Sequence, residues 1–410
     1  MENLKEVLLK NHQDHLLKYL EIANEDEKQK MIKQIDNIDF EQLNKLYKIS
    51  KNNNFNTNCK IEHSSFVDKS KLTIDELEEL KEVGKNIIKS GKYAVVTMAG
   101  GQGTRLGHDG PKGTFLLNVN PKPKYLFELI AEGLIRANKK YNITLNWYIM
   151  TSTENNDKTV EFFKEHEYFG YPKESIMFFE QGNMPFLSEE GKLLVDDSFN
   201  IKYAADGNGC IYKSMLKDGV IDDMKNKGIK WIFVGSVDNA LVNMVDTVLI
   251  GLTIKENNEI GSRSIVKSNP HEPVGVFCKK NGVPAVIEYS EISKEMAEAT
   301  DDDGELLYGE SNIMAHLYSI DAIEKISKHD LPYHSAHKKA PYMKENGELV
   351  NPTKPNAYKY EAFIFDGFSY FDNMSVLRVK REENFAPIKN KEGNDSPETA
   401  IKLYNNFWHV

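Results

Sequence analysis

The sequence YAVVTMAGGQGTRLGHDGPKG, residues 93–113, joins a short apolar run to a glycine-rich turn. Tyr93–Met98 is apolar and rich in β-branched residues, so it predicts a buried strand. The glycines that follow let backbone N–H groups approach a ligand closely and point at it together. Arg105 and Lys112 follow close behind and supply positive charge. The stretch therefore predicts a strand that ends in a site for a phosphorylated ligand.

Two familiar phosphate-binding motifs do not fit this turn. The dinucleotide motif GxGxxG, begun at Gly101, requires a glycine where the chain has Leu106. The P-loop requires Gly-Lys-Ser/Thr, whereas Lys112 stands between Pro111 and Gly113. A turn that only redirects the chain is the remaining alternative, but the density of glycine and the two nearby cations favour a ligand site.

Strands and helices alternate along the chain that surrounds the turn. This order is typical of an α/β fold with a mixed, mostly parallel sheet of Rossmann-like type and helices on both faces. Asn281-Gly282 predicts a tight hairpin turn between two further strands. The patterns predict strands at 93–98, 145–151, 176–180, 231–237, 274–279, 283–289 and 363–368, and helices at 74–90, 125–140, 159–166, 210–226 and from Ser396-Pro397 onward.

Three regions are expected from these patterns. Residues 1–90 form an N-terminal helical region, 91–378 a central domain and 379–410 a short C-terminal segment. In the first region, the leucine spacing predicts helices up to about residue 50, with a break at the acidic residues Glu25–Glu27. Residues 51–70 are expected to be a linker or loop.

Composition excludes several classes of function. The chain has 410 residues, with 62 acidic and 52 basic side chains and a net charge of -10. An anionic surface argues against binding nucleic acid or an anionic membrane, while one phosphorylated ligand needs only a local cationic pocket. Cys59, Cys210 and Cys278 show no disulfide or zinc spacing. The sequence contains no apolar run of signal-peptide or membrane-spanning length. We therefore expect a cytoplasmic protein.

Beyond residue 90, the chain resembles the uridylyltransferases that make UDP-sugars. The turn AGGQGTRLG followed by PKG resembles most closely the eukaryotic-type UDP-N-acetylglucosamine pyrophosphorylases, also called UDP-N-acetylhexosamine pyrophosphorylases. The resemblance covers about residues 90–400 and continues in order through the segments 147–152, 179–181, 206–209, 237–239, 272–276, 286–292, 354–356, 363–366 and 385–390.

The resemblance implies a reaction between UTP and N-acetylglucosamine 1-phosphate that gives UDP-N-acetylglucosamine and pyrophosphate. The attacking phosphate oxygen is already anionic, so the enzyme has to position the substrates and neutralise charge. By the same resemblance, the nucleotide is held by Met98, Ala99, Gly100, Gly101, Lys112, Gln181, Gly207, Asp238 and Lys359. The catalytic cations are Arg105, Lys112 and Lys389, and the sugar is bound by Asn208, Glu288, Tyr289 and Asn312.

The metal expected is Mg²⁺ or Mn²⁺. Asp238 follows the predicted strand 231–237, and carboxylates at such strand ends lie where ligands bind in open α/β sheets. Asp366, after the strand-like residues Phe363-Ile364-Phe365, could supply a second carboxylate. The sequence shows no His/Cys cluster of the kind zinc requires. Asp238 could instead cap a helix that begins at Asn239.

Several alternatives stay open at this point. Gln181 could simply cap its strand, and Lys359 and Lys389 could be solvated surface lysines. The same reaction could use glucose 1-phosphate or galactose 1-phosphate, or the protein could be a non-catalytic UDP-sugar-binding protein. The cations and carboxylates together favour the enzyme, because a sensor has no leaving group to stabilise. With only a short C-terminal segment after residue 390, a monomer is expected.

Overall fold

The computed structural model describes residues 2–51 and 59–409, which fall into two compact units. Of the described residues, unit 1 comprises 2–51, 182–210 and 331–363, and unit 2 comprises 59–181, 211–330 and 364–409. Each unit is therefore assembled from separate stretches of chain. Residues 59–90, which the sequence groups with the N-terminal helical region, lie in unit 2.

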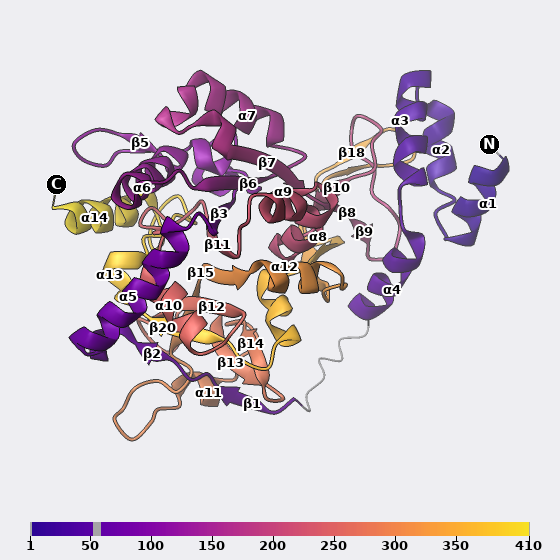
Figure 1. Cartoon of the computed structure of the whole chain (residues 1–410). Coiled ribbons are helices and arrows are strands. Elements are labelled where there is room, and N and C mark those ends of the chain that lie inside the picture. The colour runs from indigo at the N-terminus through magenta and orange to yellow at the C-terminus, as the bar shows by residue number, and fades with distance from the viewer. Residues whose placement is uncertain (1, 52–58, 410) are drawn as a thin grey trace. The chain divides into compact units, whose positions relative to one another are not determined.

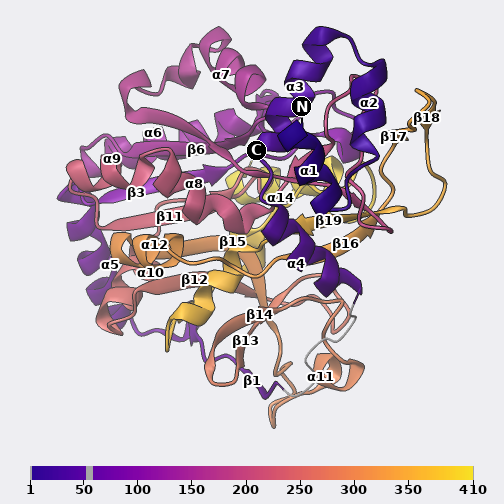
Figure 2. The ribbon, with the colours of Figure 1, turned by 90° about the vertical axis from the view of Figure 1, so that its right-hand side faces the viewer.

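Unit 2 is built on a mixed sheet whose main path runs β2-β20-β12-β15-β11-β3-β6-β7. Along this path, β15 (Glu310–Ser319) is antiparallel to both neighbours, and the other neighbouring pairs are parallel. Figure 2 shows β6, β3, β11, β15 and β12 following one another in this order. The expected α/β fold is confirmed. The remaining strands are β2 (Val67–Asp68), β20 (Ser375–Arg378), β12 (Ile260–Val266), β11 (Trp231–Ser236), β3 (Tyr93–Met98), β6 (Asn146–Ser152) and β7 (Ile176–Gln181).

Helices cover both faces of this sheet, and two adjacent residues of β6 show it. The ring of Trp147 packs against Phe163 of α7 (Asn156–Glu165), with ring centroids 5.5 Å apart. The hydroxyl of the next residue, Tyr148, donates to Asp223 of α9 (Val220–Asn226) over 2.7 Å. Because neighbouring side chains of a strand point to opposite faces, α7 and α9 lie on opposite sides.

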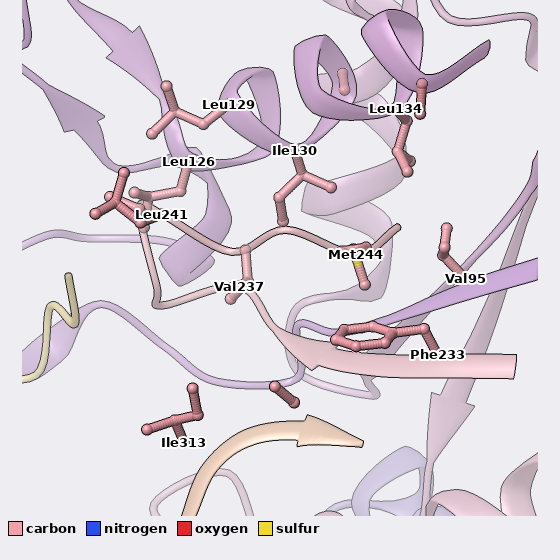
Figure 3. Close-up of a cluster of buried hydrophobic side chains, with 14 of the residues drawn as sticks. Val95, Leu126, Leu129, Ile130, Leu134, Phe233, Val237, Leu241, Met244 and Ile313 are labelled. Atoms are coloured by element: carbon pink, nitrogen blue, oxygen red, sulfur yellow. The ribbon is translucent and has the colours of Figure 1, made fainter. Parts of the chain in front are cut away.

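The face that carries α7 holds the main apolar core. Figure 3 shows Ile130 and Leu134 of α6 (Leu126–Tyr141) turned toward the strands that carry Val95 and Phe233, and Leu126 and Leu129 belong to the same buried cluster. The spacing of these leucines and Ile130 places them on one side of the helix. The opposite face is covered by α8 (Ile211–Lys217), α9 and α12 (Ile320–Ser327), and the hydroxyls of Tyr212 and Tyr318 meet there at 2.8 Å.

A β-hairpin extends unit 2 beyond the main path. β13 (Val276–Lys280) and β14 (Val283–Ile287) are joined by Asn281-Gly282, both with positive φ, as a two-residue hairpin turn requires. β1 (Ile61–His63) pairs with β13, and β2 pairs with β20. The expectation of a loop at 51–70 is therefore wrong for these two segments, and residues 52–58 lie outside the described residues.

Unit 1 contains the N-terminal helices and three small sheets. Gln13 joins these helices to a distant loop, since its side chain donates to the Gly191 carbonyl and accepts from the Leu193 N–H, both at 2.8 Å. The helices are α1 (Glu2–Lys10), α2 (Leu16–Ile22), α3 (Glu25–Asp36) and α4 (Phe40–Lys51). The strands are β8 (Asn183–Pro185) with β10 (Tyr203–Ala205), β16 (His334–Lys338) with β19 (Ala357–Glu361) and β9 (Leu187–Ser188), and β17 (Tyr342–Met343) with β18 (Leu349–Val350).

Two local expectations are wrong, each for a physical reason. Glu25–Glu27 do not break a helix but open α3, because Asn24 caps its N-terminus and acidic residues are favourable in a first turn. The segment predicted as a strand at 363–368 is instead a 3₁₀ helix over Ile364–Tyr370, whose apolar residues are buried without sheet partners. Within residues 2–51 and 59–409, none of the helices has the length and apolar composition that crossing a bilayer demands.

Two glycines set how closely α5 (Ile74–Lys89) packs on α10 (Thr247–Lys255), the helices at the lower left of Figure 1. A Cβ added to Gly251 would lie 2.0 Å from the carbonyl oxygen of Leu80. A Cβ added to Gly84 would lie 2.1 Å from the carbonyl oxygen of Thr247. Each helix thus has a glycine at the point where the backbone of the other helix is closest.

We expect Gly251→Ala to lower the free energy of unfolding by about 1–3 kcal/mol, because the added methyl overlaps backbone that cannot yield. Urea unfolding provides the measurement. The matched control is Gly133→Ala in α6, where the nearest atom to an added Cβ is Nη2 of Arg136 at 3.8 Å. There, alanine should be neutral or stabilising by up to ~1 kcal/mol. Equal unfolding midpoints for the two variants would contradict the close helix contact.

Candidate active site

The glycine-rich turn and Asp238 leave the sheet side by side. β3 and β11 are parallel neighbours, with Met98 opposite Ser236. The N–H of Val237 donates to the Met98 carbonyl over 3.1 Å, and on the other side the N–H of Ala99 donates to the Met150 carbonyl over 2.7 Å. The residues after both strands therefore emerge at the same carboxyl edge, where ligands bind in open α/β sheets.

Hydrogen bonds give the turn a defined shape. The N–H of Lys112 donates to the Gly101 carbonyl over 3.0 Å. Asn155 is fully buried, and its side-chain amide donates to the carbonyls of Ala99 and Gly101 over 3.0 and 3.3 Å. Its oxygen accepts the N–H of Ser152 over 2.8 Å. With these carbonyls engaged on the protein side, Asn155 holds the backbone of the turn in place.

Sequence reasoning missed Asn155. Its one visible signal is that it precedes the predicted helix 159–166 by four residues, since an asparagine ahead of a helix is normally read as an N-cap. Asn155 does occupy that position before α7, but its side chain forms no capping bond. It turns to the glycine-rich turn instead, a tertiary contact that helix-start patterns do not reveal.

Two neighbouring glycines of the turn have different surroundings. A Cβ on Gly100 would lie 2.7 Å from Nε2 of Gln181, so this glycine makes room for a buried glutamine side chain. A Cβ on Gly101 would meet no described atom within 4 Å. Arg105 is exposed on the 3₁₀ turn Thr104–Leu106. Gln181 therefore lies against the turn from inside the protein, while Gly101 faces open space.

Lys112 and Asp238 form an ion pair, with Nζ and Oδ2 3.1 Å apart. The side chain of Lys112 is 11% exposed and that of Asp238 is 25% exposed. Burial opposes ionisation of Asp238, but Lys112, a hydrogen bond from Ser236 and the charge of Lys389 outweigh it and hold the pKa of Asp238 below its ordinary value. The carboxylate is thus ionised and still reaches solvent.

No helix begins at Asn239, so the alternative of Asp238 as a helix cap is wrong. The next helix, α10, begins at Thr247 and is capped by Asp246. Asn239 instead binds a segment from the far end of the chain. Its side chain donates to the Asn384 carbonyl over 2.8 Å and accepts the Ala386 N–H over 2.8 Å.

This segment, residues 384–388, brings Lys389 to the same region. The N–H of Ile388 donates to the carbonyl of Asp238 over 2.8 Å. Lys389 follows directly, and its ammonium lies 3.4 Å from the carboxylate of Asp395 and 5.6 Å from the ring of Phe385. Its charge is one of those that lower the pKa of Asp238. The structure therefore places the two predicted catalytic lysines, Lys112 and Lys389, near one carboxylate.

Two of the predicted sugar-binding residues meet at Gly275. A Cβ on Gly275 would lie 2.8 Å from Oε1 of Glu288, and the N–H of Asn312 donates to the Gly275 carbonyl over 2.8 Å. Oδ1 of Asn312 accepts the N–H of Met314, and its Nδ2 has a weak sulfur acceptor at 3.8 Å. Tyr289 is 55% exposed. Glu288 and Asn312 both lie beside Gly275, and Tyr289 is the residue that follows Glu288 in the sequence.

Asp366 does not follow a strand, which removes the reason for pairing it with Asp238. It lies in the 3₁₀ helix Ile364–Tyr370, where its carbonyl accepts the hydroxyl of Ser369 and its charge contributes to the raised pKa of the buried Tyr212. Among the described residues, no three His, Cys, Asp or Glu side chains gather into a metal-binding group. Asp366 as a metal ligand stays a prediction.

The other predicted residues belong to unit 1. Gly207 has φ +95, and a Cβ there would lie 2.2 Å from the carbonyl oxygen of Ala362, so only glycine fits. Asn208 opens the 3₁₀ turn Asn208–Cys210. Lys359 lies on β19, with its ammonium 2.8 Å from Glu361. Their roles stay predictions.

Comparison with known proteins identifies the protein family to which this chain belongs. Residues 38–395 match the model of the UDPGP family, UTP–glucose-1-phosphate uridylyltransferase. The chain belongs to this family, as the motifs predicted.

Individual relatives carry narrower names. The chain is similar to UDP-N-acetylglucosamine pyrophosphorylase of Saccharomyces cerevisiae, 41% identical over 334 residues that cover 78% of this chain and 70% of the relative. It is similar to human UDP-N-acetylhexosamine pyrophosphorylase-like protein 1, 39% identical over 331 residues that cover 78% of this chain and 65% of the relative. The matched part thus spans about two thirds of these relatives. Among solved structures, UDP-N-acetylglucosamine pyrophosphorylase of Trypanosoma brucei, in complex with an inhibitor, superposes with a TM-score of 0.83 and 30% identity over 97% of this chain and 82% of that one.

We expect Gly101→Ala to abolish binding of UTP while leaving the melting temperature of the free protein unchanged. The added methyl meets no atom of the described residues within 4 Å, and it enters the space where the phosphates would approach the backbone. Isothermal titration with UTP and a thermal melt of the free protein are the two measurements. A variant that binds UTP as tightly as the wild type would show that no ligand lies against Gly101.

Proposed function

We propose that this chain transfers a uridylyl group from UTP to N-acetylglucosamine 1-phosphate and releases pyrophosphate. The observation that carries the proposal is the Lys112–Asp238 pair beside the open face of Gly101, at the carboxyl edge of the sheet. This arrangement offers cationic and backbone groups to phosphates and an ionised carboxylate to a cation. The names of the relatives supply the substrates.

The reaction needs no protein nucleophile. A phosphate oxygen of the sugar phosphate forms a bond to the α-phosphorus of UTP, and the bond from that phosphorus to the bridging oxygen of the β-phosphate breaks. Pyrophosphate leaves with the electron pair. Lys112 and the exposed Arg105 neutralise the charge that grows on the leaving group, while the turn backbone positions the nucleotide. Gln181, buried against Gly100, reads the uracil.

The residues present fit a magnesium or manganese ion that also binds the nucleotide. Mg²⁺ is commonly held by one or two carboxylates together with substrate phosphates, rather than by a cage of protein ligands. Asp238 meets this description, because it is ionised, partly exposed and not part of a larger acidic group among the described residues. Asp238 would hold the ion, which when bound supplies further charge neutralisation at the phosphates.

Sugar recognition is assigned to the cluster at Gly275. Glu288 accepts sugar hydroxyls, and Nδ2 of Asn312 is the group left to donate, since Oδ1 is already used by Met314. An acetamido group offers a carbonyl acceptor and a methyl to bury, which glucose 1-phosphate lacks. Cytoplasmic location is also a proposal, supported by three described cysteines that form no disulfide. The monomeric state stays a prediction.

A panel of sugar 1-phosphates tests the proposal through pyrophosphate release from UTP. Losing the methyl contact costs about 1 kcal/mol and leaving a buried polar group unpaired costs about 1–3 kcal/mol. We therefore expect kcat/KM for N-acetylglucosamine 1-phosphate to exceed that for glucose 1-phosphate by roughly 30- to 1,000-fold. Equal or better use of glucose 1-phosphate would overturn the N-acetylhexosamine assignment. Absence of turnover with every sugar would leave a UDP-sugar-binding protein.

Asp238→Asn keeps the shape of the side chain and removes its charge. Activity should fall at least ~100-fold, since metal-assisted charge stabilisation is worth several kcal/mol. The matched control is Asp223→Asn, a carboxylate that binds Tyr148 and Lys227 on the face covered by α9. The control should retain activity, and circular dichroism should be unchanged in both variants. Wild-type turnover by Asp238→Asn would refute the ligand assignment.

A further inference from the structure

Arg263 on β12 is a buried charge that the reaction described above does not use. Its side chain is completely inaccessible to solvent. Nη1 donates to Oδ1 of Asn384 over 2.8 Å, and Nη2 donates to the carbonyl of Asn243 over 2.6 Å. Burying a guanidinium is costly, and an apolar side chain often fills such a position at no loss of stability. This position therefore calls for an explanation beyond packing.

The two acceptors belong to the two segments that frame the active site. Asn243 lies in the loop 238–246, which begins with Asp238 and ends at the cap of α10. Asn384 opens the segment 384–388, here named the strap, which leads to Lys389. The planar fork of arginine binds both at once, in a geometry that a single ammonium does not reproduce.

The network continues from Arg263 to Asp238. Asn384 receives Arg263 on its side chain and offers its backbone carbonyl to the side chain of Asn239 over 2.8 Å. Asn239 follows Asp238 directly in the chain. Three further hydrogen bonds join residues 238–240 to the segment 384–388. They run from Ala386 to the Asn239 side chain, from Ala240 to the Ala386 carbonyl, and from Ile388 to the Asp238 carbonyl.

The other neighbours of Arg263, Phe233 and Asp246, pack against its guanidinium but accept no hydrogen bond from it. The ring of Phe233 lies 5.1 Å from the guanidinium carbon. The carboxylate of Asp246 lies 3.8 Å from Nε, too far for a hydrogen bond, and its other oxygen caps α10 through Val248 and Leu249. Nε has no acceptor among the described residues. The charge is balanced by Asp246, while the directed bonds go to the loop and the strap.

We propose that Arg263 is a positioning residue that fixes the carboxylate of Asp238 relative to Lys112 and Lys389 by binding the loop 238–246 and the segment 384–388 together. The kinetic part of this proposal rests on the uridylyltransferase function proposed above. Loosening the fork lets the strap shift while each catalytic side chain stays present. Displacements of about 1 Å at reacting groups can cost on the order of 100-fold in rate.

Asn384→Ala tests the link with little risk to folding, because Asn384 is only half-buried and its backbone carbonyl is retained. We expect kcat to fall about 10- to 100-fold, with KM for UTP changed less than about threefold. Asn384→Asp keeps an oxygen that accepts from Arg263 and should restore kcat. Arg263→Lys keeps the charge without the fork and should resemble Asn384→Ala.

Arg378 provides the matched control for loss of a buried arginine. Its guanidinium binds Glu310 and Glu305, and it has no bond to the loop 238–246 or to the segment 384–388 among the described residues. Arg378→Lys should lower the melting temperature yet keep kcat. If Arg263 had a purely structural role, kcat would fall in proportion to the loss of melting temperature in both variants, Asn384→Ala and Arg378→Lys.

Amide hydrogen exchange supplies a readout that does not depend on activity. In Asn384→Ala, the protection of peptides containing Ala240 and Ile388 should fall by about tenfold or more, while protection in β3 stays at the wild-type level. Unchanged exchange, or a kcat within twofold of the wild type, would overturn the positioning role. An inactive wild-type enzyme would instead refute the uridylyltransferase function, and the exchange experiment would still decide whether Arg263 holds the two segments together.

Discussion

The parallel pairing of β3 with β11 is the constraint on which the site depends. Because Met98 lies opposite Ser236 and the Val237 N–H binds the Met98 carbonyl, the two strands end at the same level. The glycine-rich turn and Asp238 then start from adjacent points. Lys112, fourteen positions beyond Met98 in the chain, returns to Asp238 because its own N–H is held by the Gly101 carbonyl. A shift of one residue in this register would separate the pair.

The charged side chains near Asp238 are positive, although the protein as a whole is negatively charged. The chain carries a net charge of -10, yet the carboxylate of Asp238 has Lys112 and Lys389 as its cationic neighbours. Partial burial strengthens their attraction, because water screens it less than at an exposed surface. The result is an ionised carboxylate with two cationic side chains near it. Such a site suits a ligand that brings phosphates and a divalent cation together.

The sheet edge that carries the candidate site is built from distant parts of the chain. Asn239 holds the segment 384–388 by side-chain hydrogen bonds in both directions, and Asn155 holds the carbonyls of the glycine-rich turn. Both are buried asparagines with a donor and an acceptor in use, so each side chain has one preferred orientation. Apolar side chains could fill the same space but would not fix backbone positions to the same precision.

The sequence by itself determined the features that depend on neighbouring residues. The apolar run Tyr93–Met98 became a buried strand, Ser396-Pro397 began a helix, and Asn281-Gly282 formed the hairpin turn. Each of these follows from side-chain periodicity or from backbone preference over a few positions. Family motifs added the class of enzyme.

Only the tertiary structure decided which distant groups meet. The antiparallel insertion of β15 among parallel strands, the division into two units, and the places of Asn155 and Arg263 have no local signature. The apolar residues at 364–368 fit a strand and a 3₁₀ helix equally well, and burial without a sheet partner selected the helix. Such outcomes depend on contacts between residues far apart in the chain. The free energy of these contacts cannot be read from any short stretch of sequence.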